Sequence, residues 1–160
     1  MLNPLKRPLR LYLDTSIPNF LFAEDAKDKQ KITKALFERK VRNLYEFYIS
    51  VVVIREIERA PLQKQKELKE ELDGIPILEL AKPADALAED YIAAGALPKS
   101  SFEDAQHVAI ATINNLDAVV SWNFKHLVNL RRIKLVNLVN TQMGYKHIEI
   151  ISPQEVVSYE

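Results

Sequence analysis

Cysteine is absent from this chain of 160 residues, and glycine is scarce. Without thiols the chain has no disulfides, no thiolate zinc site and no cysteine nucleophile, so any metal must be held by oxygen or imidazole ligands. Three glycines suit a helix-rich protein better than an all-β fold, which needs many tight turns. A reducing, cytoplasmic location is the simplest expectation for a chain with no thiols to oxidise.

An excess of one charge is also missing. Lys+Arg and Asp+Glu both total 22, so the net charge is zero and gives no sign of a polyanionic partner. The chain has no long hydrophobic run, and residues 1–8 lack the apolar segment of a signal peptide, so no membrane partner is expected. The length and the 48% hydrophobic content predict one folded domain over residues 1–160.

Short apolar segments alternate with amphipathic segments along the chain. The apolar segments predict strands at residues 9–13, 47–53, 118–121 and 147–151, and a weaker one at 75–80 that contains a proline. The amphipathic segments predict helices at residues 25–42, 61–73, 83–94, 102–115 and 127–143. This alternation predicts an α/β fold in which helices cover both faces of a mostly parallel sheet of four or five strands.

Polar residues follow three of the predicted strands at the carboxyl ends, which is where open α/β sheets bind ligands. Asp14 follows the first strand, Glu56 follows the second, and Asn123 follows the strand at 118–121. Asp104 begins the predicted helix 102–115 on the same face as apolar residues, so its carboxylate is directed toward the sheet. Three carboxylates in one pocket repel one another, and the pattern therefore predicts a bound cation.

Magnesium suits such a pocket best, because it takes oxygen ligands and keeps several of its waters. A magnesium–carboxylate site can activate a water for phosphodiester cleavage, with Glu56 or Asp104 orienting that water. Each residue also has a simpler structural explanation. Asp14 can belong to an ordinary turn that caps a helix, Glu56 can lie on an exposed helix face, and His107 can be a packing histidine. The case for a site depends on the ordered combination.

Several segments resemble the PIN-domain nucleases, a family that includes the VapC-type toxins of bacterial and archaeal toxin–antitoxin pairs. The most specific segment is FEDAQHVAIA at residues 102–111, which is similar to the family's Asp-Ala-x-x-x-Ala helix. The family's first strand resembles LYLDTS, and its second strand resembles ISVVVIREI. The strand and loop that usually bring a fourth acidic residue resemble VVSWNFKHL. The tail at residues 148–156 resembles its closing strand. The resemblance implies a three-layer α/β/α PIN-like domain.

The resemblance also implies roles for individual residues. Asp14 and Asp104 would be direct metal ligands, and Glu56 would be a metal-linked or water-positioning carboxylate. Ser16 and His107 would be supporting groups near the site.

Asn123 completes the expected catalytic set but departs from the family pattern, in which an aspartate is frequent at this position. An amide binds a metal more weakly than a carboxylate and cannot act as a base. Asn123 therefore leaves the presence of a second metal ion open.

A carboxylate site suits RNA and DNA equally on its chemistry alone, and the resemblance implies single-stranded RNA as the substrate. The expected function is therefore a Mg²⁺-dependent endoribonuclease, with Mn²⁺ as a substitute ion. By the resemblance, the protein would be the toxin of a type II pair, with a small antitoxin protein as partner and a homodimer as its assembly. The predicted helix 127–143 is apolar nearly all round, so we expect it to be buried on several sides, either inside the fold or against a second subunit.

Basic residues that are candidate phosphate contacts occur in clusters in spite of the zero net charge. These are Lys27, Lys29, Lys31 and Lys34, then Arg39, Lys40 and Arg42, and finally Lys125, Arg131, Arg132 and Lys134. Each cluster can equally be a solvated helix face.

Two other functions stay open. Asn123 is compatible with a catalytically weak or inactive PIN-like module that binds RNA or protein. A receiver domain, in which an aspartate at a strand end accepts phosphate, is disfavoured because no acidic pair directly follows the first strand.

Overall fold

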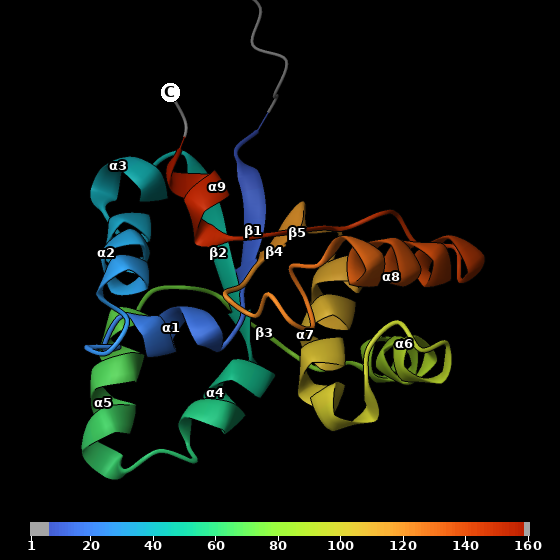
Figure 1. The fold of residues 1–160 in the computed structure, drawn as a ribbon, viewed down its shortest axis with the longest axis horizontal. Helices are drawn as coiled ribbons and strands as arrows, with labels where there is room; N and C mark the ends of the chain where they lie inside the picture. Colours follow the sequence, from blue (N-terminus) through green and yellow to red (C-terminus); the bar gives the residue numbers. More distant parts are fainter. Residues whose placement is uncertain (1–6, 159–160) are drawn as a thin grey trace, which may run out of the picture.

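The computed structural model describes residues 7–158 and contains a five-stranded sheet with helices on both faces (Figure 1). The strands are β1 (Leu9–Leu13), β2 (Tyr45–Ser50), β3 (Ile77–Leu78), β4 (Ala118–Val120) and β5 (Glu149–Ile151). Their order is β3-β2-β1-β4-β5, and every pair of neighbours is parallel. The predicted three-layer α/β/α fold is therefore confirmed. The segment 1–6, where we expected no signal peptide, lies outside the described residues.

The helices are grouped on the two faces of this sheet. In Figure 1, α2, α3 and α9 lie on one side, and α6, α7 and α8 lie on the other. The helices are α1 (Ser16–Phe20), α2 (Lys27–Leu36), α3 (Arg39–Arg42), α4 (Val51–Ile57), α5 (Leu62–Glu71), α6 (Lys82–Ala93), α7 (Phe102–Ile113), α8 (Leu130–Gln142) and α9 (Pro153–Val157). Within the described chain, every helix is too short or too polar to cross a membrane.

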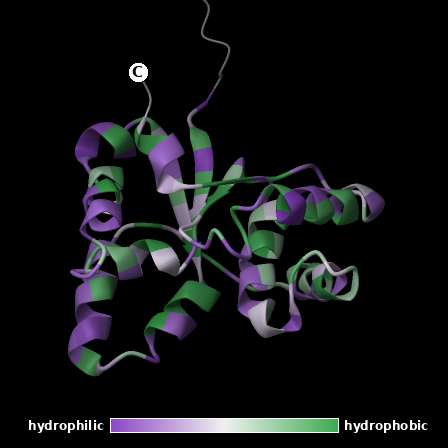
Figure 2. Cartoon of the chain, in the orientation of Figure 1, coloured by the Kyte–Doolittle hydropathy of each residue, from purple (hydrophilic) through white to green (hydrophobic). Residues whose placement is uncertain are grey.

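Strand β1 lies at the centre of the sheet and is the most deeply buried part of the core. Leu11 pairs with Phe47 of β2 on one side and with Ala118 of β4 on the other. Because helices cover both faces, Leu11 and its neighbours Tyr12 and Leu13 are all buried. The peripheral helix α5 is less buried than β1. It is largely hydrophilic in Figure 2, and its buried residue is Leu68.

The prediction of a strand over residues 47–53 is wrong at its C-terminal end. The strand stops at Ser50, whose hydroxyl accepts a hydrogen bond from the backbone N–H of Val52 at 3.1 Å. This N-cap begins α4 directly after β2, so Val51 to Val53 are helical although their β-branched side chains favour a strand. Glu56 therefore lies in the second turn of this helix.

Three other predictions need correction. The predicted helix 25–42 is divided into α2 and α3, because the backbone of Glu38 is extended. The weak strand 75–80 is reduced to the two residues of β3, and strand 147–151 begins only at Glu149. The short helices α1 and α9 are not predicted by hydrophobic periodicity, which needs a longer segment.

Helix 127–143 is not buried on several sides within this chain, so the expected placement inside the fold is wrong, while the placement against a second subunit stays a prediction. The helix begins at Leu130, where the side chain of Asn129 caps it by accepting from the N–H of Arg132 at 3.2 Å. Leu130 is 72% exposed and Leu138 is 56% exposed, whereas Val136 and Val139 face the core. One face of α8 is therefore apolar and open to solvent.

Candidate active site

Asp14 lies at the carboxyl end of β1 and is almost fully buried. Its Oδ1 atom accepts hydrogen bonds from the backbone N–H of Ser16 at 3.1 Å and from the Ser16 hydroxyl at 2.5 Å. Its Oδ2 atom accepts a hydrogen bond from the hydroxyl of Ser121, which follows β4, at 2.5 Å. The turn offered above as a structural explanation for Asp14 is present, and it also holds the carboxylate in one orientation at the sheet edge.

Glu56 and His107 form a close pair between α4 and α7. The Nε2 atom of His107 lies 2.6 Å from Oε1 of Glu56, and the histidine side chain is buried. Glu56 is partly buried, which excludes the exposed helix face offered above as its simpler explanation. Thr15 adds a weaker contact, with its hydroxyl 3.4 Å from the same Nε2 atom. His107 is therefore both a core residue and the group that orients Glu56.

A chain of buried hydroxyls supports the other side of the His107 ring. The Tyr12 hydroxyl lies 2.5 Å from Nδ1 of His107 and 2.6 Å from the hydroxyl of Ser50. Since the Ser50 oxygen already accepts from the N–H of Val52, its own proton can go to Tyr12, and Tyr12 can donate to Nδ1. In that arrangement every polar group has a partner, and Nε2–H is left to donate to Glu56.

Asp104 lies in the first turn of α7, and the Asn123 amide nitrogen donates a hydrogen bond to its Oδ2 at 3.2 Å. The amide oxygen of Asn123 accepts a hydrogen bond from the backbone N–H of His126 at 3.0 Å. Exchanging the amide oxygen and nitrogen would place two donors together at His126 and two acceptors together at Asp104, so the orientation is fixed. Asn123 therefore presents a donor, not a metal-binding oxygen, to Asp104.

The carboxylates differ in their electrostatics. Burial raises the pKa of Asp14, against the opposing effects of His107 and the two serine hydroxyls. Burial also raises the pKa of Asp104, to about 6, and the charges of Asp14 and Glu56 add to this shift. For Glu56, burial is outweighed by the hydrogen bond and charge of His107, so its pKa is lowered. Glu56 raises the pKa of His107 in return, against the effect of burial.

This arrangement fits an oxygen-preferring cation only in part. The described part of the chain has no group of three or more His, Cys, Asp or Glu side chains arranged to hold a metal ion. Burial disfavours the ionised forms of Asp14 and Asp104, the charge of Asp14 adds to this effect at Asp104, and a cation would relieve that cost. Two carboxylates completed by waters and substrate oxygens are a usual magnesium environment. The donor set therefore fits an open site better than a closed cage.

Several groups at this site are not in the predicted set. Ser121 and Tyr12 lie within predicted strands, where alternation and burial suggest only packing, and Ser50 lies inside an apolar run. Polar residues in otherwise apolar strands are a signal for a buried hydrogen-bond network. That signal is weak in one sequence, because it does not say which groups meet.

The basic clusters occupy different environments. Arg132 donates to the backbone carbonyls of Gly95 and Ala96, so its role is structural in part. Lys125 lies in the exposed loop after Asn123.

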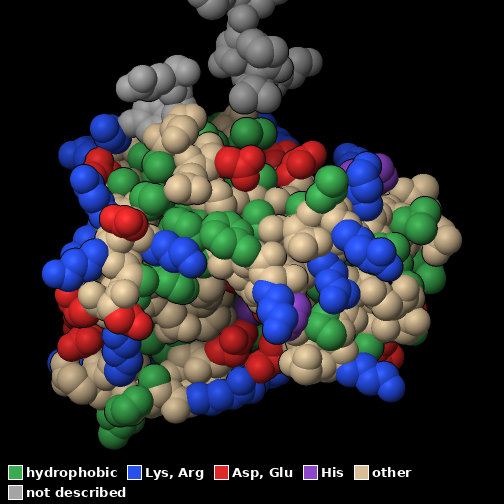
Figure 3. Space-filling view, in the orientation of Figure 1, with side chains coloured by type: hydrophobic (Ala, Val, Ile, Leu, Met, Phe, Trp, Pro, Cys, Tyr) green, Lys and Arg blue, Asp and Glu red, His purple; other side chains and the backbone are tan. Residues whose placement is uncertain are grey.

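In Figure 3, acidic side chains gather in the lower middle of the face shown, beside histidine and basic side chains. Although the net charge of the chain is zero, acidic and basic side chains are therefore unevenly distributed over this face.

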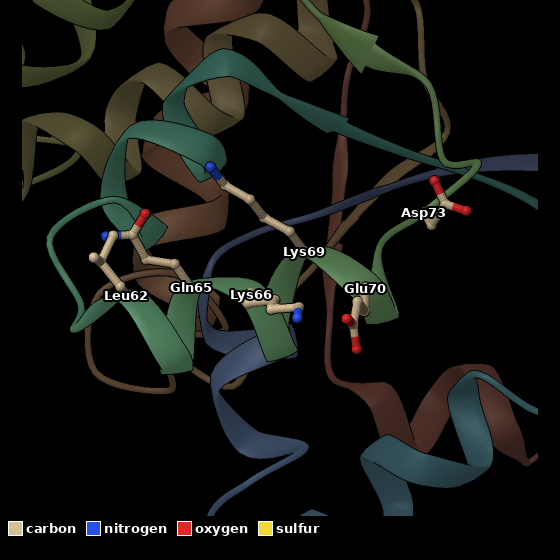
Figure 4. A pocket seen from close by; sticks show the side chains of 6 residues that line it. All are labelled: Leu62, Gln65, Lys66, Lys69, Glu70 and Asp73. Atoms are coloured by element: carbon tan, nitrogen blue, oxygen red, sulfur yellow. The ribbon is translucent and has the colours of Figure 1, made fainter.

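A hollow of about 510 Å³ on α5 is separate from these carboxylates (Figure 4). Its lining consists of Leu62, Gln65, Lys66, Lys69, Glu70 and Asp73. The labelled side chains in Figure 4 point in different directions and do not converge on one point, so we do not assign the chemistry to it.

Comparison with known proteins agrees with this geometry. The family model described as the PIN domain matches residues 11–126, which include all the carboxylates described above. A solved structure, that of VapBC2 from Rickettsia felis bound to a DNA fragment from their promoter, is similar in fold. The TM-score is 0.56 at 13% identity over 90% of this chain and 98% of the other. Among curated proteins, none matches the chain in sequence. PIN domains are generally nucleases that use divalent metal ions, and this chain belongs to the PIN domain family.

Proposed function

We propose that this protein is a Mg²⁺-dependent endoribonuclease that hydrolyses phosphodiester bonds of single-stranded RNA, with Mn²⁺ able to replace Mg²⁺. The observation that carries the proposal is the grouping of Asp14, Glu56 and Asp104 at one edge of a parallel sheet, where the charges of Asp14 and Glu56 raise the pKa of Asp104 and the charge of Glu56 raises that of Asp14. Burial raises the pKa of Asp14 and of Asp104, so a cation would favour their ionised forms, and the two carboxylates supply the oxygen ligands that magnesium prefers.

Asp14 and Asp104 are the proposed metal ligands. A bound ion supplies a Lewis acid for the scissile phosphate and lowers the pKa of an attacking water. Ser16 and Ser121 keep the Asp14 carboxylate in a fixed orientation, and Asn123 does the same for Asp104.

Glu56 is the proposed group that orients the water and accepts its proton. Its lowered pKa keeps it ionised at neutral pH, as a proton acceptor must be. His107 holds Oε1, which leaves Oε2 available to the water. The Nε2–H of His107 donates to Oε1 at 2.6 Å, so the proton taken from the water stays on Oε2.

A toxin of a type II toxin–antitoxin pair is the biological role we propose. Its support is the membership of the PIN domain family together with the similarity in fold to VapBC2 from Rickettsia felis. The proposed partner is a small antitoxin protein in the cytoplasm, and its gene product should copurify with this chain.

A homodimer is the assembly we propose. Its support is the open apolar face of α8, where the exposed Leu130 and Leu138 line a groove of about 560 Å³. Light scattering should give the mass of a dimer, and L138E should reduce it to that of a monomer.

The decisive test is RNA cleavage by the purified protein. With Mg²⁺ or Mn²⁺ the protein should cut single-stranded RNA, and chelation should stop it. Asp104→Asn should lower the rate by at least about a hundredfold, since it removes a ligand charge while keeping the shape. Asp73→Asn, at an exposed aspartate, is the matched control. A folded Asp104→Asn protein that cuts as well as the wild type would contradict the proposal.

A second candidate is a catalytically weak or inactive PIN-like module that binds RNA or protein. The observation that favours it is the Asn123 amide, which turns its nitrogen toward Asp104 where a carboxylate would add a ligand. Calorimetric titration with Mn²⁺ separates the two candidates. An inactive module should show no binding that depends on Asp14 and Asp104.

A further inference from the structure

Three aromatic side chains surround the ammonium group of Lys29 next to the carboxylate site. The Nζ atom lies 5.2 Å from the ring centroid of Phe124, 5.3 Å from that of Phe20 and 5.5 Å from that of Trp122. These distances are within the range of cation–π attraction. We name Lys29, Phe20, Trp122 and Phe124 the aromatic–lysine cluster.

The cluster is attached to the site by the backbone and by hydrogen bonds. Trp122 and Phe124 flank Asn123, which contacts Asp104. The backbone N–H of Trp122 donates a hydrogen bond to the Ser16 hydroxyl at 2.9 Å. The Ser16 hydroxyl in turn donates a hydrogen bond to Asp14. The cluster therefore adjoins the residues that contact Asp14 and Asp104.

The rings are held in place and one of them is open to solvent. The Trp122 indole N–H donates to the Thr33 hydroxyl at 2.8 Å, and the ring packs against Phe20 and, edge to face, against Phe124. Phe124 is 43% exposed although it is fully apolar. Figure 3 shows hydrophobic side chains at the surface in the middle of the same face as the acidic ones, beside basic side chains. An exposed, rigid ring is a suitable surface for stacking.

The charge of Lys29 has no carboxylate partner. None of the ion pairs within residues 7–158 includes Lys29, although this side chain is only partly exposed. A cation over aromatic rings and without an anion is suited to a phosphate group. Proteins that bind single-stranded nucleic acid combine these two elements, aromatic rings for bases and cations for the backbone.

We propose that the aromatic–lysine cluster is a nucleotide subsite, in which one base of single-stranded RNA stacks on Phe124 and the adjoining phosphate contacts Lys29. The subsite rests on the proposed function, since it binds the RNA that the carboxylates cut. Stacking accepts any base, so the subsite selects unpaired RNA over duplex rather than a particular sequence.

Binding is measured apart from cleavage, in the Asp104→Asn background and without divalent metal. Trp122 is the chain's one tryptophan, so its fluorescence reports directly on the cluster. Single-stranded RNA of about ten nucleotides should quench this fluorescence, and an abasic chain of equal length should bind more weakly. Phe124→Ala should weaken RNA binding about tenfold, and Phe124→Tyr should keep it within about twofold.

Lys29→Gln should weaken RNA binding. It should also reduce the slope of log affinity against log salt concentration by about one, as expected for the loss of one phosphate contact. Leu62→Ala, which removes another exposed apolar side chain, is the control and should change nothing. Thermal unfolding of each variant shows that the fold is kept.

The outcomes separate this inference from the proposed nuclease function. RNA binding that Phe124→Ala leaves unchanged overturns the subsite, even if the wild type cuts RNA with Mg²⁺. Binding that depends on Phe124 in a protein that never cuts supports the subsite and overturns the nuclease function. Loss of antitoxin binding in Phe124→Ala with RNA affinity intact overturns the subsite and assigns the cluster to a protein partner.

Discussion

The Tyr12 hydroxyl lies 2.5 Å from Nδ1 of His107, while the opposite nitrogen of the same ring lies 2.6 Å from Glu56. The ring thus connects a fully buried tyrosine of the central strand to the carboxylate that we propose orients the water. When His107 is neutral, Nδ1 accepts from Tyr12, and when it is charged, Nδ1–H donates to the Tyr12 oxygen. In both states Nε2–H faces Glu56.

Tyr12→Phe should therefore impair both stability and cleavage. It leaves Nδ1 of His107 without a partner, which costs about 1–3 kcal/mol of unfolding free energy. Because the ring and Glu56 lose their fixed orientation, kcat should fall about tenfold with little change in KM. Steady-state cleavage assays and denaturant unfolding measure the two effects.

Tyr91→Phe is the matched control for this variant. The Tyr91 hydroxyl is also buried and donates to Asn140 at 2.5 Å, but it contacts none of the residues of the candidate site. It should lower stability to a similar degree and leave kcat unchanged. Equal losses of kcat in the two variants would mean that Tyr12 acts only through the fold.

Asp104→Asn should stabilise the metal-free protein at neutral pH. The pKa of Asp104 is raised from 3.8 to about 6, so between these values the folded chain holds a proton that the unfolded chain lacks. Stability thus falls as the pH rises toward 6, and above it the ionised carboxylate costs about 1 kcal/mol after allowance for solvent screening.

Calorimetric melting in chelator is the measurement for this prediction. At pH 7.5 the Tm of the variant should exceed that of the wild type by about 2–4 °C, and the difference should vanish below pH 4. Adding Mn²⁺ should then raise the wild-type Tm alone. A variant with an equal or lower Tm at pH 7.5 would disprove the claim that Asp104 is held at a cost.

Asn123→Asp should strengthen metal binding. An aspartate keeps the acceptor for the N–H of His126, but it replaces the amide donor to Asp104 with a negative charge. The metal-free protein should lose about 1 kcal/mol from this repulsion, and Mn²⁺ affinity should rise about tenfold. Isothermal calorimetry measures the affinity, with Asn123→Ala, which adds no charge, as control. An unchanged affinity would place residue 123 outside the metal's ligand sphere.

Ser121→Ala should weaken metal binding through Asp14. The Ser121 hydroxyl donates to Asp14 at 2.5 Å, so its loss raises the pKa of this carboxyl further and makes the ionised form harder to reach. We expect Mn²⁺ affinity to fall about tenfold at pH 6 and less at pH 8. Thr112→Val, which removes another buried hydroxyl, should leave the affinity unchanged. A loss of affinity that does not depend on pH would be evidence against this explanation.

The order of strands and helices could be predicted from the sequence because hydrophobic periodicity and strand-end polar residues are local signals. Asp14, Glu56 and Asp104 were candidates on this basis, since each follows a predicted strand or lies in the first turn of a predicted helix and parallel strands end at one edge. The boundary at Ser50 was not, because β-branched residues continue past it and only the cap decides where the helix begins.

Only the tertiary structure decided how the side chains meet. Nothing local to Tyr12, Ser50 or Ser121 says that a histidine or a carboxylate lies opposite, because these contacts join residues 38 to 107 positions apart. The same holds for Lys29, whose three aromatic neighbours come from α1 and the loop after β4. The sequence by itself determined the fold class and indicated the acidic residues as candidates, since both depend on pattern. The orientation of each acid depends on packing, which is a property of the folded chain.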